Sequence, residues 1–465
     1  MERDEETAAL VYGPEDRPAA GPLVLAALQH LLAVFLAIVT PPLLIAGALG
    51  IPDQGTVAYL VSMALVTSGI GTFIQCRGIG PFGARLLSVQ GTSFAFCAPL
   101  IAIGLAAQAE AAKSGLAASE IAYGLPLLFG CAMCAASVEI VAAFLFRFLR
   151  KIVTPVVSGT VVALIGFCLI REGVVDCGGG HAAQSGLGDF PFASWRYLAV
   201  SGVTFMTIAV LSLSRSARLR MLSVLAGLAA GGVAAACLGM WRFSPAELPL
   251  VHVPHPLRWG LKIDGGACLS LGIVYLVTAI EATGDITATT LVSRLPLGDE
   301  AYCRRVKGGV LAGGVLSFFA GALNAFPCAI FAQNNGLIQL TGVASRRVGY
   351  ALAAFLVVLG LLPPVGRLFA ALPAPVLGGA TLLMFGMVAA AGIRIIASQP
   401  IGRDETLVLA LSLAACLGVE LCPDVLAAAP ACFRRIFSSG LVAGSCVALL
   451  ANAIVQFERT CHERT

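Results

Sequence analysis

Two carboxylate side chains, Glu281 and Asp285, stand in an otherwise apolar stretch, LSLGIVYLVTAIEATGDITATT. Four residues apart, they lie on one face of a helix, about one turn from each other. Ionisable groups at membrane depth are costly unless they are paired or hydrated, and two carboxylates this close in a low dielectric do not both ionise readily. The spacing predicts a site that can hold or exchange a proton. The alternative is a helix that ends before Glu281 and leaves both acids hydrated.

Three amide side chains follow one another at Gln333, Asn334 and Asn335, before Gly336. An amide both donates and accepts hydrogen bonds, so the run suits a neutral heterocycle with alternating N–H and C=O groups. A carboxylate such as Glu281 only accepts, and its two oxygens suit two N–H groups on one ring edge. Irregular backbone here could bind a ligand or line a hydrated cavity. The alternative is a polar hinge packed between helices.

The other polar residues in apolar runs carry weaker signals. His30 is the one histidine of five within an apolar run, and we interpret it either as a proton relay or as a buried structural donor. Glu139 and Glu420 are interpreted as cap or interface partners. The Cys131-x-x-Cys134 pair has no histidine nearby and is interpreted as two small buried side chains. We therefore expect no metal site, and no cofactor.

The composition shows what surrounds these residues. Of 465 residues, 58% are hydrophobic and 12% charged, whereas soluble domains have about 25% charged residues. The surplus apolar side chains need lipid as their solvent, which excludes a soluble enzyme, a disordered protein and a nucleic-acid binder. The net charge of +4 is spread along the chain, so we expect no nucleic-acid partner.

Fourteen stretches are apolar and close to the length of about 20 residues that crosses a bilayer. They are 22–48, 55–76, 86–104, 121–146, 152–170, 196–214, 221–240, 265–284, 306–325, 328–345, 349–369, 374–397, 405–421 and 436–457. The third is interrupted around Ser88–Ser93 and the tenth around Gln333–Gly336. Interruptions in matching positions of two halves are typical of transporters built from internal repeats. Because seven is odd, two seven-segment halves would be inverted relative to each other. The sequence predicts an all-α polytopic membrane protein with short extended breaks in segments 3 and 10.

The basic residues support this count. With the N-terminus inside, 20 of the 29 Lys and Arg residues fall in inner loops and tails, as the positive-inside rule requires. Both termini are therefore predicted to be cytoplasmic, and the protein is placed in the cytoplasmic (inner) membrane. The acidic residues 1–21 are predicted to be a loose cytoplasmic tail.

Four motifs resemble the nucleobase–ascorbate transporter family, in its bacterial purine-permease branch. They are Gln29-His30, Gln90–Phe94, Glu281–Asp285 and Gln333–Gly342, and the similarity runs from about residue 22 to 457. The resemblance implies a core domain that moves against a gate domain, a homodimer and proton symport. The core is expected at 22–150 and 263–371, and the gate at 151–262 and 372–465.

The resemblance also implies roles for single residues. Glu281 and Gln333 would bind the base, and Phe94 would stack on it. Backbone at Ser93 and Ala332 would complete the pocket. Asp285, His30 and Asn334 are expected to couple protons or support the site.

One departure concerns the ninth segment, where family members commonly carry an acid and this chain has Gly313. The pattern Gly309-Val-Leu-Ala-Gly313 lets helix backbones approach closely. Either the ninth helix packs here with no space for a carboxylate, or the acid was lost because Glu281 and Asp285 suffice or because another group has replaced it.

These observations predict a proton-coupled importer of an oxopurine, xanthine or urate, that works by alternating access. Its expected partners are the nucleobase, protons and the lipid bilayer. A uracil permease of the same family is one alternative, although uracil members tend to carry Glu where Gln333 stands. A more distant alternative is an anion transporter of the same architecture, whose substrate Glu281 would repel. A membrane enzyme would need catalytic motifs that the sequence lacks.

Overall fold

The computed structural model describes residues 10–145, 154–184, 186, 188–214, 216–240, 253–297, 299–397, 400–426, 428–430, 433, 437 and 439–462. The first nine residues of the expected tail, the expected domain boundary after residue 150 and residues 241–252 of the expected gate lie outside these ranges.

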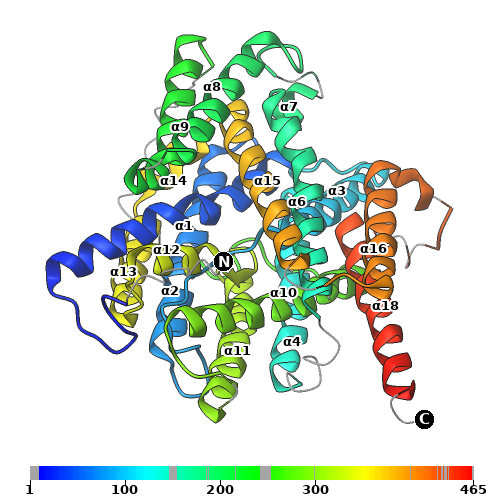
Figure 1. The fold of residues 1–465 in the computed structure, drawn as a ribbon. Helices are drawn as coiled ribbons and strands as arrows, with labels where there is room; N and C mark the ends of the chain where they lie inside the picture. Colours follow the sequence, from blue (N-terminus) through cyan, green and yellow to red (C-terminus); the bar gives the residue numbers. More distant parts are fainter. Residues whose placement is uncertain are drawn as a thin grey trace.

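Helices form almost all of the regular structure in these ranges (Figure 1). The long helices are α1 (Ala20–Ala48), α2 (Gln54–Arg77), α3 (Cys97–Lys113), α4 (Leu125–Phe144), α6 (Pro155–Cys177), α8 (Trp195–Ser212), α9 (Ala217–Cys237), α10 (Gly265–Val292), α11 (Glu300–Ala322), α13 (Arg346–Leu361), α15 (Ala374–Ile396), α16 (Arg403–Leu421) and α18 (Gly440–His462). Shorter helices are η1 (Phe94–Phe96), η2 (Ala122–Gly124), α7 (Gly180–Gln184), α12 (Gln333–Thr341), α14 (Pro363–Ala370) and η3 (Pro423–Leu426). Two three-residue strands, β1 (Gln90–Thr92) and β2 (Cys328–Ile330), interrupt the helical pattern. The expectation of a mostly helical membrane protein is confirmed.

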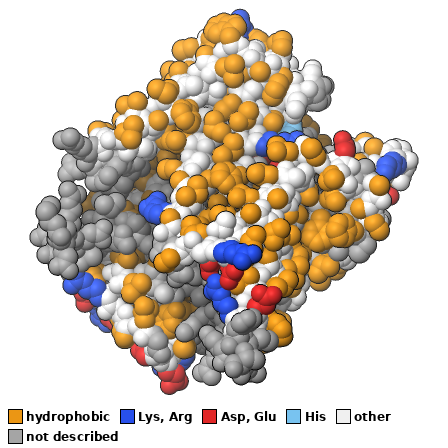
Figure 2. Space-filling view, turned by 45° about the vertical axis from the view of Figure 1, so that its right-hand side comes forward, with side chains coloured by type: hydrophobic (Ala, Val, Ile, Leu, Met, Phe, Trp, Pro, Cys, Tyr) orange, Lys and Arg blue, Asp and Glu red, His pale blue; other side chains and the backbone are white. Residues whose placement is uncertain are grey.

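Eight of the described helices are long and apolar enough to cross a membrane: α1, η1 with α3, η2 with α4, α2, α8, α10, α15 and α18. Each of the fourteen predicted stretches overlaps a helix, and the number fourteen stays a prediction. Figure 2 shows hydrophobic side chains over most of the described part of one face, with charged side chains only in small groups. Such a surface is suited to lipid.

The predicted segment 349–369 is not one straight helix. It consists of α13 and α14, bent by 80° relative to each other. The break falls at Leu362, whose backbone is extended, immediately before Pro363. A residue that precedes proline is disfavoured in the helical conformation, and this accounts for a bend that the apolar pattern of the eleventh segment does not show.

Aspartate residues set the start of three helices that matter for the site. Asp53 accepts hydrogen bonds from the backbone of α2, Asp264 from that of α10 and Asp299 from that of α11. Such caps satisfy backbone N–H groups that have no partner within the helix.

The helices pack in two groups. In the first, α2 packs on α13 and α4 on α11, while α1 contacts α2 and α10 contacts α11. In the second, α6 packs along α15, α8 on α9 and α16 on α18. The two groups meet where α1 contacts α9 and α15, and where α10 contacts α6 and α18.

The chain before α1 is not loose where it is described. Tyr12 forms a strand-like bridge with Val343, and the backbone N–H of Ala344 donates to the Tyr12 carbonyl at 2.8 Å. Glu15 forms an ion pair with Arg346. Residues 11–16 are thus fixed across the connection between α12 and α13, which corrects the expectation of a loose tail for this part.

Candidate functional site

β1 falls within the interruption predicted for the third segment and lies beside β2 of the tenth. In the tenth segment the extended residues are Cys328–Ile330, whereas Gln333–Gly336, where the interruption was predicted, begins the helix α12. β1 pairs with β2 in antiparallel fashion, with Gly91 opposite Ala329. A Cβ atom on Gly91 would lie 2.7 Å from both Ile38 of α1 and the Phe331 ring, so only glycine lets α1 pass this closely. Each strand lies near the start of its predicted segment and is followed by a helix, η1 after β1 and α12 after β2.

Both acids of the eighth segment lie within a continuous helix. α10 runs to Val292, two turns beyond Asp285, so the alternative of a helix that ends before Glu281 is wrong. Glu281 lines a small cavity of about 10 Å³ together with Val157, Ser158 and Val161 of α6 and Leu449 of α18. This volume corresponds to about one water molecule. Glu281 therefore faces the second helix group across a nearly closed contact.

Asp285 is buried and adjoins α12. Its Oδ2 atom has no hydrogen-bond partner among the residues described. The backbone carbonyl of Asp285 accepts from Nδ2 of Asn335 at 3.4 Å, and the Thr289 hydroxyl donates to Oδ1 of Asn335 at 2.5 Å. The Asn335 amide thus joins α12 to α10 at the turn that carries Asp285. Asn335 belongs to the amide run, but no role for it was predicted from the sequence.

The side-chain amide of Asn334, next to Asn335 in the chain, connects α12 to the segment before β1. Nδ2 of Asn334 donates to the backbone carbonyl of Leu87 at 2.5 Å, and the His30 imidazole of α1 lies beside the same amide. His30 and Asn334 are both 1% exposed. Nδ1 of His30 and Oδ1 of Asn334 have no partner in the described part of the chain. The structure therefore brings together two of the three residues predicted to support the site.

Phe94 and Ser93 follow β1 directly. The Phe94 ring meets Phe385 of α15 edge-on, with centroids 5.5 Å apart, so Phe94, like Glu281, faces the second helix group. The backbone N–H of Ser93 donates to the Pro327 carbonyl at 2.9 Å. In this conformation it is therefore engaged within the protein, and the part of the Ser93 backbone in a ligand pocket stays a prediction.

Ala332 and Gln333 lie at the start of α12 and differ from their neighbours in exposure. Both side chains are exposed, whereas Phe331, Asn334 and Asn335 are buried. Gln333 makes no side-chain hydrogen bond to any described residue, and it is not joined to Glu281. α12 ends at Thr341, and Gly342, with a φ of +66°, is its left-handed C-cap, which explains the glycine at the end of this motif.

A buried amide network that the sequence analysis missed lies on the other side of β1. Nε2 of Gln75 in α2 donates to Oε1 of Gln90 and to the Gly309 carbonyl, each at 2.9 Å. Oε1 of Gln75 accepts from the Ala84 backbone. Gln90 belongs to the motif Gln90–Phe94, which was recognised in the sequence. Its hydrogen bond with Gln75 became visible only in the structure.

The ninth helix packs closely where the acid was expected. A Cβ atom on Gly313 would lie 2.6 Å from Oε1 of Glu139, and one on Gly309 would lie 2.4 Å from Ile286. Glu139 of α4 is 2% exposed. The space over Gly313 is therefore filled by a carboxyl group from another helix. This agrees with the interpretation of Glu139 as an interface partner, although its contact with Gly313 was not predicted.

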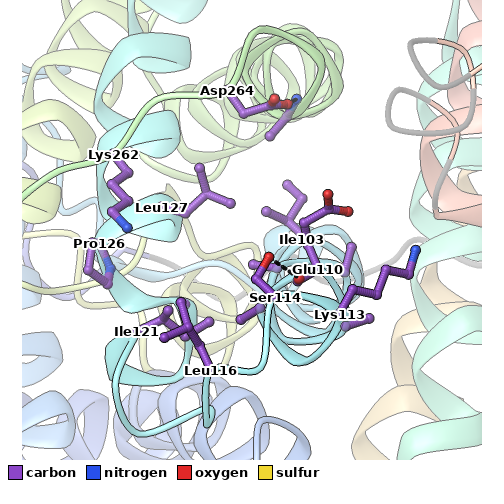
Figure 3. A pocket seen from close by; sticks show the side chains of 16 residues that line it. Ile103, Glu110, Lys113, Ser114, Leu116, Ile121, Pro126, Leu127, Lys262 and Asp264 are labelled. Carbon is purple, nitrogen blue, oxygen red and sulfur yellow. Dashed lines mark hydrogen bonds between the residues drawn. The ribbon is translucent and has the colours of Figure 1, made fainter.

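Two larger cavities, both lined by described residues, lie away from these residues. One of about 540 Å³ opens where α3, α4 and the start of α10 meet, and Figure 3 shows Lys113, Lys262, Glu110 and Asp264 around it. Another of about 740 Å³ lies beside the N-terminal segment and carries five cationic side chains: Arg85, Arg304, Arg305, Lys307 and Arg346. Neither cavity contains a residue predicted for the substrate site.

Comparison with known proteins identifies the chain's relatives. A family model described as the permease family matches residues 21–425. The xanthine permease XanP of Escherichia coli (strain K12) is 44% identical over 98% of this chain and 96% of that protein. The xanthine permease XanQ of the same strain is 41% identical over 96% of this chain and 94% of that protein. The uric acid permease PucJ of Bacillus subtilis (strain 168) is 34% identical over 91% and 90%.

Solved structures share the fold at low sequence identity. A structure of SLC26A9 superposes with a TM-score of 0.63 at 11% identity, over 93% of this chain and 64% of that one. The transmembrane domain of the cyanobacterial bicarbonate transporter BicA superposes with a TM-score of 0.56 at 14% identity, over 95% and 99%. At these identities the likeness concerns the fold alone.

Proposed function

The chain belongs to the permease family, and we propose that within this family it is a proton-coupled importer of an oxopurine, xanthine or urate. The similarity to xanthine permeases over nearly the whole chain supports a nucleobase as the substrate. One structural observation supports the site: the Glu281–Asp285 turn of α10 is hydrogen-bonded to the amide-bearing start of α12. As a permease, the protein is a transporter and not an enzyme.

In this proposal the base binds between the two helix groups. Both Glu281 and Phe94 face the second group, which contains α6, α15 and α18. Glu281 accepts from two ring N–H groups, Phe94 stacks on the ring, and the exposed Gln333 supplies a donor and an acceptor. Backbone near Ala332 completes the site. The cavity of about 10 Å³ beside Glu281 is far below the size of ligand pockets, about 300 Å³ or more, so the base enters only after the groups separate.

The helix contacts support a gate group that moves against a core group. The contact of α2 with α13 has its counterpart in that of α11 with α4, seven predicted segments later. The pairs α1–α2 and α8–α9 correspond in the same way to α10–α11 and α16–α18. Such a pattern is what two inverted repeats of seven segments produce. Fourteen spans, both termini in the cytoplasm, location in the inner membrane and a homodimer belong to the same proposal.

Proton coupling is assigned to the acid pair. Asp285 is buried with an unpartnered oxygen among the described residues, and a lone carboxylate in such a place gains by binding a proton. His30 and Asn334 support α12 at its other side. When the pair takes up one proton, Asp285 carries it and is neutral. Glu281 then remains ionised and can accept hydrogen bonds from the base.

The anion-transporter alternative has one supporting observation, the shared fold with SLC26A9 and BicA. The carboxylate at Glu281 opposes it, because an anionic substrate would meet a like charge in a low dielectric. A uracil permease is disfavoured by the Gln333 amide.

Uptake measurements test the proposal. Cells that express the protein, and matched cells that do not, are given radiolabelled xanthine, urate, guanine and uracil. We expect accumulation of xanthine or urate that a protonophore abolishes. Accumulation of uracil alone, or uptake unaffected by the protonophore, would contradict the substrate or the coupling, respectively.

A further inference from the structure

The Glu139 carboxyl is a buried acid outside the proposed substrate site. It lies in the C-terminal half of α4, a helix that packs against α11 and α10, and it is 2% exposed. Its Oε2 atom has no hydrogen-bond partner within the described ranges. An ionised carboxylate in such surroundings is strongly disfavoured, so the group is either neutral or paired when the protein changes state.

No cation stands close to this acid in the described part of the molecule. Two titratable side chains close enough to sense its charge are Tyr275 of α10 and Cys328 of β2. Lys307, the cation nearest to Gly313 along α11, lies over the Phe144 ring, 4.5 Å from its centroid. A proton is therefore the available partner that can neutralise Glu139.

Two unsatisfied polar groups converge beside Gly313. An atom at the Cβ position of Gly313 would be 2.6 Å from Oε1 of Glu139 and 3.5 Å from Nε2 of Gln90. Nε2 of Gln90 is buried and has no partner among the described residues, while Oε1 of Gln90 is already held by Gln75. An ionised Glu139 carboxylate could accept a hydrogen bond from Nε2 of Gln90. The same hydrogen bond to a neutral carboxylic acid is weaker.

We propose that Glu139 is a second proton-binding group of this transporter. Because Gly313 has no side chain, it leaves space for the Glu139 carboxyl beside Gln90 of β1. Proton uptake converts the carboxylate to a carboxylic acid and releases Gln90. Loss of the proton restores an acceptor that draws the Gln90 amide and β1 toward α4. Because Phe94 follows β1 by two residues, this movement reaches the proposed substrate site. The inference rests on the proposed function, since it concerns the coupling of that transport.

The test uses purified protein reconstituted in lipid vesicles, with Glu139→Gln as the main variant. This variant keeps the shape of the side chain but cannot titrate. We expect exchange of labelled xanthine or urate across the membrane to be retained within about twofold, while proton-driven accumulation falls about tenfold, the size of a typical coupling between two ligands. Ser137→Ala, an exposed neighbour on α4, is the control. Unchanged accumulation with an unchanged pH profile in Glu139→Gln would overturn the inference.

A second pair of variants separates the carboxyl group from its helix. Glu139→Ala should lose accumulation, and Gly313→Asp alone should lose the folded protein because two acids would collide. The double variant Glu139→Ala/Gly313→Asp moves the carboxyl from α4 to α11 at the same place, and we expect it to regain pH-dependent accumulation. A double variant no better than Glu139→Ala would count against the proposal.

The inference and the proposed function fail in different ways. Wild-type vesicles that take up no oxopurine would contradict the proposed function. Glu139 is then tested without substrate, by the infrared carbonyl band of a protonated carboxyl in the purified protein. Loss of this band in Glu139→Gln would support the proton site, and an unaltered spectrum would refute it.

Discussion

Asn335 of α12 holds α10 at the turn that contains Asp285. Its Nδ2 atom donates to the Asp285 carbonyl at 3.4 Å, and its Oδ1 atom accepts from the Thr289 hydroxyl at 2.5 Å. The same hydroxyl lies 2.7 Å from the Asp285 carbonyl, so one hydrogen serves two acceptors. The Asn335 amide thus connects α10, which carries the two acids, to α12, which carries the amide run. A movement of α12 would therefore displace the backbone at Asp285.

A double-mutant cycle measures this connection. We expect Asn335→Ala and Thr289→Val each to lower the thermal stability of the purified protein, with a coupling energy of about 1 kcal/mol between them. Thr287→Val is the matched control, because the Thr287 hydroxyl pairs with Tyr302 instead of α12 and should be additive with Asn335→Ala. Additive effects of Asn335→Ala and Thr289→Val would show that the hydrogen bond contributes nothing.

Glu281→Gln is expected to abolish substrate binding. The substitution keeps the shape of the side chain but presents N–H groups to the ring N–H groups of the base, and each buried group left unpaired costs about 1–3 kcal/mol. Binding of labelled substrate to the purified protein, or uptake by cells, measures the loss. Glu120→Gln, an exposed carboxylate changed in the same way, should bind normally. Near-normal affinity in Glu281→Gln would remove this residue from the site.

Asp285→Asn should separate coupling from recognition. Removal of one charge of the pair eases ionisation of Glu281, so we expect substrate binding to survive. Proton-driven accumulation should fall, and its pH dependence should shift to lower pH. The measurement is concentrative uptake across the acid-to-neutral range, beside equilibrium binding. The coupling role is excluded if accumulation by Asp285→Asn equals that of the wild type at every pH.

His181 of α7, outside the membrane-spanning helices, predicts a pH dependence of stability. Its hydrogen bond with Glu172, at 2.9 Å, raises the pKa of His181, and Asp176 adds to the effect while burial opposes it. The folded state therefore binds this proton more tightly than the unfolded chain. The contribution is fully present below the ordinary pKa of about 6.5 and is lost as the pH rises through the higher folded value.

Thermal unfolding of the purified protein at a series of pH values measures this contribution. We expect His181→Gln to flatten the decline in stability with rising pH, with an effect of no more than about 1 kcal/mol because the pair is partly exposed. His255→Gln provides the comparison, since its backbone and not its ring is hydrogen-bonded to Tyr59 and Asn324. Parallel curves for wild type and His181→Gln would show that the pair does not contribute.

The amino-acid sequence alone was sufficient to predict the membrane class, the family and the interruption near Gln90. Local chemistry decides these features: apolar runs require lipid, and the break near Gln90 follows from polar and glycine residues within such a run. The break in the tenth segment was predicted at Gln333–Gly336, but the extended residues are Cys328–Ile330 and Gln333 begins a helix. Glu281 and Asp285 could likewise be placed on one face of a helix, because i and i+4 are neighbours whenever the helix continues. The bend before Pro363 was also available from the sequence, through the restriction that proline imposes on Leu362, but the apolar pattern outweighed it.

What only the tertiary structure decided is which distant residues meet. Glu139 and Gly313 are far apart in the chain, and nothing in either segment shows that the carboxyl of one fills the space left by the other. The same holds for Gln75 with Gln90, and for Asn335 with Thr289. A sequence records the spacing of residues along one helix, whereas contacts between helices depend on how their surfaces pack. For that reason the acids and amides could be recognised by type, while their partners emerged only when the helices were placed together.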